Sequence, residues 1–415
     1  MSAPHSLRIT NASVLDVGTE AILPNRTIVI RDGHIAGVFS GSGADAAPDV
    51  IDGEQVIDVG GKVVMPGLID GHVHATAATA DLAGLGEWSP NYVAAHAARL
   101  LKNMLFRGFT TVRDVAGADY GLAQAIEEGL FLGPRLVFGG KALSQTGGHG
   151  DMRSAGTSLL DDHQCCPSFS LVCDGVSAVR KAARDQLRTG AHHIKLMLSG
   201  GVASPTDRVD STQFSEEEIR AAVEEAEAAN RYVTGHAYTA RAINRGLKLG
   251  VRCIEHGNLL DAESVRLFLE HDAFLVPTLI TYERLKVDGI ASGLSVTNHA
   301  KVDAVLEAGV AALDLANKGG VRIVFGTDLL GDMQQHQSGE FTIRARVQSP
   351  AEVLRSATLT AADLLGMTGL IGVIAAGAHA DLLVVNGNPL EDVTILATPD
   401  ESIELIVKGG VVVTV

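Results

Sequence analysis

Clusters of basic residues are absent from this sequence of 415 residues. Lys and Arg number 33 against 49 Asp and Glu, and the formal net charge is −16. No run of Lys and Arg would suit a phosphate backbone or an anionic lipid surface. The composition therefore argues against nucleic acid and membranes as partners, and we expect a small-molecule substrate instead.

Long apolar runs are also lacking. The longest, such as Ala375–Val385, are interrupted by Gly, His or Asp and are too short to span a bilayer. The segment MSAPHSLRIT at the start has no basic stretch followed by an apolar one, as a secretory signal would. We therefore expect a cytoplasmic protein, although a chain whose signal had been removed would look the same.

Cysteine and tryptophan are scarce. The four cysteines are Cys165, Cys166, Cys173 and Cys253, and none belongs to a paired CxxC motif. They are too few and too unevenly spaced for a disulfide framework, which favours free thiols over zinc ligands. The single tryptophan, Trp88, leaves few platforms on which a substrate could stack.

What is present begins with a β-rich pattern at both ends of the chain. Short strand-like segments, such as 26–31 and 34–39, are separated by turn signals at Asp32-Gly33 and Gly60-Gly61. The same pattern returns at 380–386 and 403–413. We predict a small composite β-sandwich domain made of residues 1–62 and 371–415.

Between these ends, strand-like runs alternate with helical periodicity. The eight strand-like segments are 63–74, 110–114, 135–139, 192–198, 232–236, 251–256, 274–278 and 321–328. The clearest helix is predicted at 215–230, where Ser215 and Glu218 form a capping-box pattern. The alternation predicts an α/β fold in which residues 63–370 form a (β/α)8 TIM-like barrel. An open doubly wound sheet is the alternative.

Residues of the types that can bind metals occur at the ends of these segments. His72 and His74 close the first segment, Lys195 lies late in the fourth, and the fifth, sixth and eighth end in His236, His256 and Asp328. Active sites of such barrels lie at the carboxyl ends of the strands, so these side chains are expected at one mouth. Singly, each has a plainer explanation: a packing histidine, a surface lysine, or a helix cap for the aspartate. Their joint placement favours a metal site.

Lys195 is the informative member of this set, because an ammonium group repels metal ions. It is either a neutral base or a carbamate formed with carbon dioxide, which could bridge two ions. Carboxylate and imidazole ligands suit zinc best, with manganese or cobalt as alternatives.

Two motifs make the sequence resemble the amidohydrolase superfamily over nearly its whole length. They are MPGLIDGHVH at residues 65–74 and GVIAAGAHADL at residues 372–382. The resemblance implies two divalent metal ions. His72, His74 and Asp328 would hold the buried ion, His236 and His256 the exposed one, and carboxylated Lys195 would bridge both. Asp328 would also carry the proton.

Three further segments resemble a branch of metal-dependent dipeptidases and ochratoxin-degrading amidohydrolases. They are TTVRD at 110–114, SQTGGHG at 144–150 and HAYT at 236–239. This resemblance implies that His149 and Tyr238 lie near the substrate, with His149 a candidate donor to the oxyanion. A solvated loop histidine and a packing tyrosine are the alternatives. Arg241, just past the fifth segment, is a further candidate for binding a substrate carboxylate.

The leading expectation is hydrolysis of the amide bond in N-acyl-L-amino acids or dipeptides, including ochratoxin-type N-acyl-phenylalanine amides. The nucleophile would be a hydroxide that bridges the two ions. A cyclic-amide hydrolase of the imidazolonepropionase kind is the enzymatic alternative, and a non-catalytic scaffold barrel is the third reading. The branch resemblance also suggests a homo-oligomer.

Overall fold

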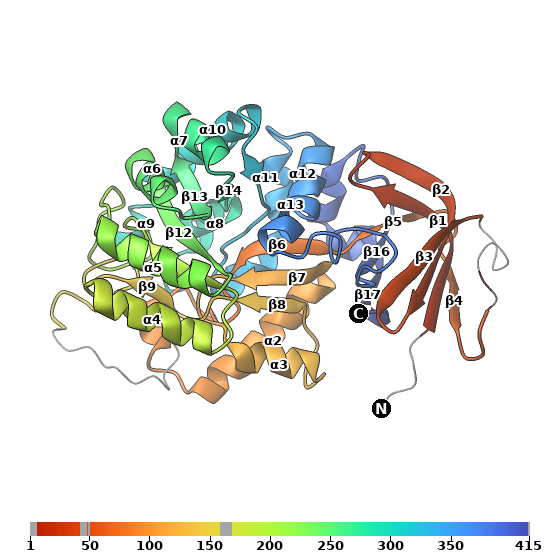
Figure 1. The fold of residues 1–415 in the computed structure, drawn as a ribbon, viewed down its shortest axis with the longest axis horizontal. Coiled ribbons are helices and arrows are strands. Elements are labelled where there is room, and N and C mark those ends of the chain that lie inside the picture. Colours follow the sequence, from red (N-terminus) through yellow and green to blue (C-terminus); the bar gives the residue numbers. More distant parts are fainter. Residues whose placement is uncertain (1–5, 42–47, 49, 158–167, 414–415) are drawn as a thin grey trace. The chain divides into compact units, whose positions relative to one another are not determined.

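The computed structural model describes residues 6–41, 48, 50–157 and 168–413. The chain divides into two compact units. The first contains the described residues within 1–70, 103–111 and 344–415, and the second contains those within 71–102 and 112–343. The described strands form three sheets, of 8, 7 and 3 strands (Figure 1).

The first unit contains a mainly antiparallel sheet with strand order β18-β17-β16-β5-β1-β2-β3, and β4 pairs with β1. These strands are β1 (Ser6–Asp16), β2 (Ala21–Arg31), β3 (His34–Ser40), β4 (Gln55–Asp58), β5 (Val63–Pro66), β16 (Leu382–Val385), β17 (Ile403–Lys408) and β18 (Val411–Val413). Strands from the two ends of the sequence therefore hydrogen-bond within one sheet, since β16 pairs with β5.

The turn between β2 and β3 confirms the turn predicted at Asp32-Gly33. Both residues have positive φ, +49° and +78°, as a two-residue hairpin turn of the primed type requires. The core of this unit likewise combines early and late strands. Ile9, Ile28 and Val64 pack in one buried cluster with Leu382 and Val384, so burial of apolar side chains holds the two ends of the sequence together.

The central part of the chain has an α/β fold with parallel sheets. One sheet has the order β10-β9-β11-β12-β13-β14-β15, in which every pairing is parallel, and another has the order β6-β7-β8. The strands are β6 (Leu68–Val73), β7 (Phe109–Asp114), β8 (Arg135–Phe138), β9 (Ala142–Ser144), β10 (Ser170–Val172), β11 (His193–Met197), β12 (Tyr232–Thr239), β13 (Cys253–Leu259), β14 (Phe274–Val276) and β15 (Arg322–Ile323). The eight predicted segments all contain strands, and the three-residue strands β9 and β10 were not predicted.

One predicted strand was wrong in its extent. The segment 63–74 is two strands in two sheets, because β5 pairs with β1 and β16 whereas β6 belongs to the sheet with β7 and β8. Pro66 has no N–H with which to continue a ladder. At Gly67 a Cβ atom would lie 2.1 Å from Oγ1 of Thr110, so only glycine fits there. The chain changes sheet at this position.

Helices follow most of the strands. They are α1 (Leu82–Leu85), α2 (Pro90–Phe106), α3 (Tyr120–Glu127), α4 (Val176–Arg188), α5 (Glu216–Ala228), α6 (Ala240–Lys248), α7 (Ala262–Glu270), α8 (Leu279–Asp288), α9 (Val296–His299), α10 (Asp303–Lys318), α11 (Glu340–Arg344), α12 (Pro350–Ser356), α13 (Leu359–Leu364) and α14 (Pro399–Ser402), with 3-10 helices at Gly331–Gly339 and Val393–Ala397. The capping box predicted for α5 is confirmed: Glu218 N donates to Ser215 Oγ, and Ser215 N donates to the Glu218 carboxylate.

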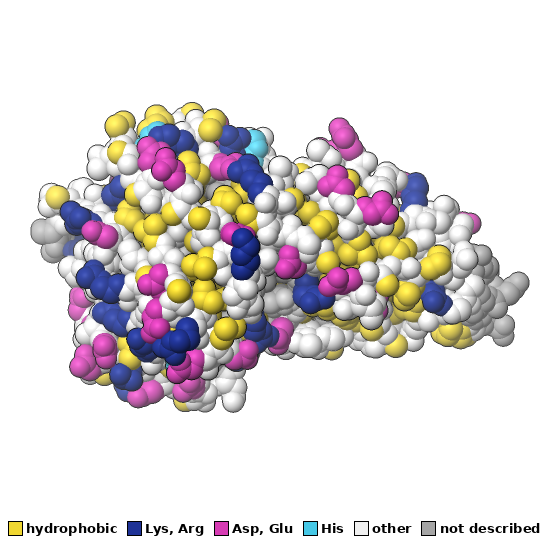
Figure 2. Space-filling view, turned by 90° about the horizontal axis from the view of Figure 1, so that it is seen from above, with side chains coloured by type: hydrophobic (Ala, Val, Ile, Leu, Met, Phe, Trp, Pro, Cys, Tyr) yellow, Lys and Arg dark blue, Asp and Glu magenta, His cyan; other side chains and the backbone are white. Residues whose placement is uncertain are grey.

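Basic and acidic side chains are interspersed on the face seen in Figure 2. Ion pairs also join neighbouring helices: Arg184 of α4 pairs with Glu225 of α5 at 2.7 Å, and these helices lie side by side in Figure 1. Among the described residues, no helix combines the length and apolar character needed to cross a membrane. Cys173 and Cys253 are buried free thiols, as predicted, whereas Cys165 and Cys166 lie outside the described residues.

Candidate metal centre

Two histidines and one aspartate converge on a single point in the second unit. Asp328 Oδ1 lies 3.2 Å from Nε2 of His72 and 3.1 Å from Nε2 of His74. One ligand atom from each of the three residues lies within 4.8 Å of the other two. This group could hold a metal ion, since imidazole nitrogen and carboxylate oxygen are the ligands that zinc prefers alongside thiolate.

The backbone explains why these three residues meet. His72 lies in β6 and His74 directly follows it, so the two side chains emerge on the same side of the strand. The amides of Thr327 and Asp328 both donate to the carbonyl of His72, at 3.2 and 2.9 Å. Asp328 itself has a φ of +53°, which non-glycine residues rarely adopt. A strained backbone of this kind is a common feature of functional sites.

Further imidazole rings extend from this group. The ring centroids of His72 and His256 are 5.0 Å apart, those of His256 and His236 are 4.6 Å apart, and those of His236 and His149 are 4.2 Å apart. The prediction that His236 and His256 close their strands was wrong. Pairing continues beyond them through an irregular register as far as Thr239 in β12 and Leu259 in β13.

Each predicted histidine ligand has one ring nitrogen held by a neighbour. Nδ1 of His72 contacts Oε2 of Glu255 at 2.7 Å, and Nδ1 of His74 donates to the Ala116 carbonyl at 2.8 Å. Nε2 of His236 lies 3.2 Å from the Gly200 carbonyl, and Nδ1 of His256 lies 2.8 Å from Oγ1 of Thr278. Such contacts fix the ring orientation and leave the other nitrogen for a ligand, as in most protein metal sites.

Glu255 is a buried residue of this site that reasoning from the sequence missed. Its Oε1 accepts from Nη2 of Arg113 at 2.7 Å, while Oε2 faces His72. Burial raises the pKa of Glu255, but Arg113, His72 and Lys195 outweigh it and hold the pKa well below its ordinary value. The available signal was an acidic residue inside the strand-like segment 251–256, because a buried charge requires a partner.

Lys195 lies in β11 with only 2 % of its surface exposed. Among the residues that the structure describes, its ammonium group has no hydrogen bond and no ion pair within 4 Å. Burial lowers the pKa of Lys195, although Glu255 and Asp328 act in the opposite direction. A lysine this deeply buried is destabilising if its amine is charged and has no partner, so the site suits an amine that is neutral or chemically modified.

The electrostatics of the other candidate ligands favour metal binding. Burial lowers the pKa of both His236 and His256 well below the ordinary value. Burial raises the pKa of Asp328, but the adjacent His72 and His74 outweigh it and hold the pKa well below its usual range. Neutral imidazoles and an ionised carboxylate are the protonation states in which these groups bind metal ions.

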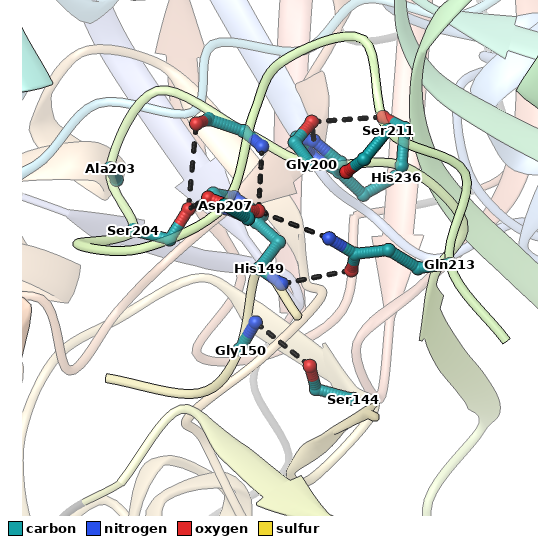
Figure 3. A network of polar contacts seen from close by, with 12 residues as sticks. Ser144, His149, Gly150, Gly200, Ala203, Ser204, Asp207, Ser211, Gln213 and His236 are labelled. Carbon is teal, nitrogen blue, oxygen red and sulfur yellow. Dashed lines mark hydrogen bonds and ion pairs between the residues drawn. The ribbon is translucent and has the colours of Figure 1, made fainter. Parts of the chain in front are cut away.

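His149 belongs to a polar network that also reaches His236, as Figure 3 shows. Its ring stacks on the His236 ring, and its Nδ1 lies 2.7 Å from Oγ of Ser204. Burial lowers the pKa of His149. The loop histidine singled out in the sequence is therefore a buried neighbour of the candidate ligands rather than a solvated residue.

Tyr238 also lies beside the candidate ligands, whereas Arg241 lies on the surface. The Tyr238 ring centroid is 4.7 Å from that of His236 and 5.4 Å from that of His256. Its hydroxyl accepts from the hydroxyl of Tyr282 in α8 at 3.3 Å, a residue that the sequence reasoning did not single out. Arg241 is exposed in the first turn of α6 and donates to the Asp210 carbonyl at 3.0 Å.

Comparison with known proteins places these observations in context. A model of the amidohydrolase family matches residues 63–412. Ochratoxinase of Aspergillus niger is 33 % identical to this chain over 422 residues, which covers 97 % of this chain and 85 % of that protein.

Solved structures are similar over almost the full length. A prolidase complexed with N-methylphosphonate-L-proline is 47 % identical, with a TM-score of 0.94 and coverage of 98 % of this chain and 99 % of that one. A Xaa-Pro dipeptidase with bound methionine in its active site is 28 % identical, with a TM-score of 0.86 and the same coverage. The family match and these likenesses imply a TIM-barrel-like α/β fold for this chain.

Proposed function

The chain belongs to the amidohydrolase family and is a hydrolase of amide or peptide bonds, and we propose that it releases the carboxy-terminal residue from N-acyl-L-amino acids or dipeptides. The observation that carries this proposal is the position of two phenols beside a metal-binding group. Tyr238 and Tyr282 share a hydrogen bond next to His256, whose Nδ1 lies 3.9 Å from Oδ2 of Asp328. A hydrolytic centre and donors for a carboxylate are thus adjacent.

One group of the described residues could hold a metal ion, and we infer that a second ion binds beside it. Zinc is the first candidate, with manganese or cobalt as alternatives. His72, His74 and Asp328 would hold one ion, and His236 and His256 would hold the other. Lys195, as a carbamate, would supply the anionic oxygens shared by both ions. Its unpartnered buried amine and the anchored imidazoles support this assignment. When bound, such ions lower the pKa of water towards neutrality and polarise a carbonyl.

We also propose that β6–β8 and β11–β15 close into a (β/α)8 barrel. Two backbone hydrogen bonds support closure where the two parallel sheets are separate. His192 N donates to the Phe138 carbonyl at 2.9 Å, beside β8 and β11, and Gly71 N donates to the Phe325 carbonyl at 2.7 Å, between β6 and the segment after β15. Closure would bring the carboxyl ends of the strands to one mouth.

Asp328 is proposed to move the proton. Its low pKa keeps the carboxylate ionised, so it can accept a proton from the attacking water. The same carboxyl would then deliver that proton to the leaving nitrogen, which completes cleavage of the C–N bond. The Asp328 carboxylate lies against both imidazoles, with Oδ1 at 3.2 Å from Nε2 of His72 and 3.1 Å from Nε2 of His74.

The two phenols are proposed to recognise the substrate carboxylate. Burial raises the pKa of both Tyr238 and Tyr282, so their hydroxyls remain protonated donors at neutral pH. Tyr282 donates to Tyr238, which leaves the Tyr238 hydrogen for an anion. Arg241 could add positive charge from the surface at the start of α6.

The test combines metal analysis with a substrate panel on the purified protein. We expect close to two zinc-like ions per chain and release of free amino acid from Xaa-Pro dipeptides, N-acyl-phenylalanine amides or related N-acyl-amino acids. The carboxamide of each substrate serves as its control, and should be hydrolysed more slowly. In Asp328→Asn we expect the metal content to be retained and turnover to fall by about 10²- to 10⁴-fold, the usual contribution of a positioned acid or base.

Other outcomes would contradict separate parts of the proposal. Two ions without release of amino acid would overturn the substrate class and favour cyclic amides. A single ion would contradict the bridging role of Lys195. A protein without metal and without hydrolytic activity would support a scaffold, and unchanged turnover in a metal-loaded Asp328→Asn variant would exclude Asp328 as the proton carrier.

A further inference from the structure

A buried serine and a buried aspartate lie behind His149, in the segment between β11 and α5 (Figure 3). Ser204 is fully buried and Asp207 is 9 % exposed. Nδ1 of His149 lies 2.7 Å from Oγ of Ser204, and that hydroxyl donates in turn to Oδ1 of Asp207. The three side chains form a hydrogen-bonded row that ends on a carboxylate.

The direction of the hydrogen bonds in this row follows from the donor capacity of each group. The Ser204 hydroxyl has one hydrogen and two acceptors within reach, Oδ1 of Asp207 and, at 3.4 Å, the Gly201 carbonyl, neither of which can donate. The hydrogen points at the closer of the two, Oδ1 of Asp207. The Ser204 oxygen is then available to His149 only as an acceptor. Nδ1 of His149 therefore carries the hydrogen, and the neutral ring has its lone pair on Nε2.

Two donors prevent Asp207 from turning away from this arrangement. Oδ2 of Asp207 accepts from Gly201 N and from Nε2 of Gln213, each at 3.1 Å. The Gln213 amide is itself oriented, because its Oε1 accepts from His149 N at 2.8 Å. Both donors to Oδ2 are thus fixed, which leaves Oδ1 for Ser204.

Lys301 holds the loop that carries the serine and the aspartate. Its ammonium group donates to the carbonyls of Gly201, Ser204 and Asp207, at 3.3, 2.8 and 3.0 Å. The same group lies 3.6 Å from Oδ1 of Asp207. The negative charge of Asp207 is therefore balanced in the protein interior, as a buried carboxylate requires.

The free edge of the His149 ring faces an accessible space. The side chain is 11 % exposed, and its Nε2 has no hydrogen-bond partner among the described residues. The ring also stacks on His236, at 4.2 Å between centroids. Nε2 is thus the ring atom through which His149 can meet a substrate.

We propose that Ser204 and Asp207 are positioning residues that hold His149 in the Nδ1–H tautomer, so that it presents a hydrogen-bond acceptor to the substrate. A neutral His149 in this state accepts an N–H or O–H of the substrate and does not donate to an oxyanion, which differs from the role expected from the sequence. The contribution to catalysis rests on the proposed function, whereas the tautomer can be measured without any substrate.

The experiment replaces Asp207 by asparagine, which has the same shape. Because Gly201 N and the Gln213 amide are donors, the asparagine oxygen takes the place of Oδ2 and its NH2 group faces Ser204. Ser204 then accepts from that NH2 group, and its hydrogen turns to Nδ1 of His149, which at 2.7 Å is closer than the Gly201 carbonyl at 3.4 Å. We expect Nδ1–H in the wild type and Nε2–H in Asp207→Asn, as read from the ¹⁵N shifts of histidine-labelled, zinc-loaded protein.

The His149 signals are assigned by their loss in His149→Gln. A matched control is Asp210→Asn in the same loop, whose side chain is 62 % exposed and pairs with Arg208. The control should keep the wild-type tautomer. An Nε2–H tautomer in the wild type, or an unchanged tautomer in Asp207→Asn, would overturn the proposal.

A kinetic measurement tests the consequence of the tautomer. With a substrate found in the panel above, kcat of Asp207→Asn should fall by about 10²-fold, as on loss of one preorganised hydrogen bond in an active site, with KM within about threefold. Equal kcat in wild type and variant would contradict the positioning role. If the wild type hydrolyses no amide but the tautomer reverses in Asp207→Asn, the proposed function fails, whereas the positioning of His149 by Ser204 and Asp207 is supported.

A second variant covers the case in which Asp207→Asn does not fold. Ser204→Ala removes the hydroxyl but leaves Gly201, Gln213 and Lys301 around Asp207. His149 then has no directing acceptor, and both tautomers should be present. A wild-type spectrum in this folded variant would show that Ser204 does not direct the ring.

Discussion

Glu255 in the second unit and Glu54 in the first are both buried carboxylates held by arginine, yet their remaining partners differ. Glu54 accepts from two permanent cations, Arg8 at 3.2 Å and Arg31 at 2.6 Å, and its side chain is fully buried. The charge of Glu54 is thus neutralised by two arginines that do not contact any candidate metal ligand. The cluster ties β1 and β2 to the segment before β4.

Glu255 has one permanent cation, Arg113 at 2.7 Å, and shares its other oxygen with Nδ1 of His72 at 2.7 Å. The opposite nitrogen of His72 faces Asp328 at 3.2 Å. A change at Glu255 therefore alters both the folded state and the orientation of a candidate metal ligand. The comparison teaches that the partner of a buried carboxylate, rather than its burial, separates a structural cluster from a functional one.

The largest difference is expected when each glutamate loses an arginine. Arg113→Met leaves Glu255 buried without a permanent cation, and the free energy of unfolding should fall by about 3–5 kcal/mol. Arg8→Met leaves Glu54 with Arg31, so the loss should be closer to the value of one charged hydrogen bond, about 1.5–3 kcal/mol. Urea unfolding of the metal-loaded variants measures both. Equal losses would mean that Glu54 depends on Arg8 as strongly as Glu255 depends on Arg113.

Removing the charge of Glu255 should lower the metal affinity of the protein, whereas removing the charge of Glu54 should not. In Glu255→Gln one oxygen becomes an N–H donor that faces His72 or Arg113, so the orientation of His72 is disturbed. We expect metal affinity to fall by about 10- to 100-fold, the usual effect of losing a residue that orients a ligand. Titration against a competing chelator measures this change.

The matched control is Glu54→Gln, which has no contact with a candidate ligand. Its metal affinity should equal that of the wild type. A comparable loss of affinity in both variants would contradict the separation of the two clusters, because it would mean that general destabilisation weakens metal binding.

The same comparison shows how far the sequence leads. His72, His74 and Asp328 could be expected to meet, because each ends or follows a strand-like segment and the motif at residues 65–74 resembles a known family. Glu255 is 183 residues from His72, and their contact depends on which strands neighbour each other in space. No local pattern contains that information.

Local signals predicted local structure well. The capping box at Ser215 and the turn at Asp32-Gly33 depend on a few neighbouring residues, and both are confirmed. The unbroken strand at 63–74 was wrong, because its break at Gly67 depends on the distant side chain of Thr110. Ser204 and Asp207 were missed for the same reason, since loop residues have no periodicity and their partner His149 lies far away in the sequence.

The smallest expected effect is the pH dependence that Glu54 contributes to stability. Burial raises the pKa of Glu54, but Arg31 and Arg8 outweigh it and lower the pKa from its ordinary value of 4.5. Between the lowered pKa and 4.5, the unfolded chain binds a proton that the folded protein does not. The stabilisation is therefore fully present above pH 4.5 and is lost as the pH falls through the folded pKa.

The measurement is the difference in free energy of unfolding between the wild type and Glu54→Gln as a function of pH. The difference should be constant above pH 4.5 and should narrow below it, because glutamine does not titrate. Its full size should be smaller than the loss in Arg113→Met, since each unit of pKa shift corresponds to only about 1.4 kcal/mol. A difference that widens as the pH falls would show that the arginines do not stabilise the charged form of Glu54. Glu54 would then no longer be an example of a carboxylate with a purely structural role, to be compared with Glu255.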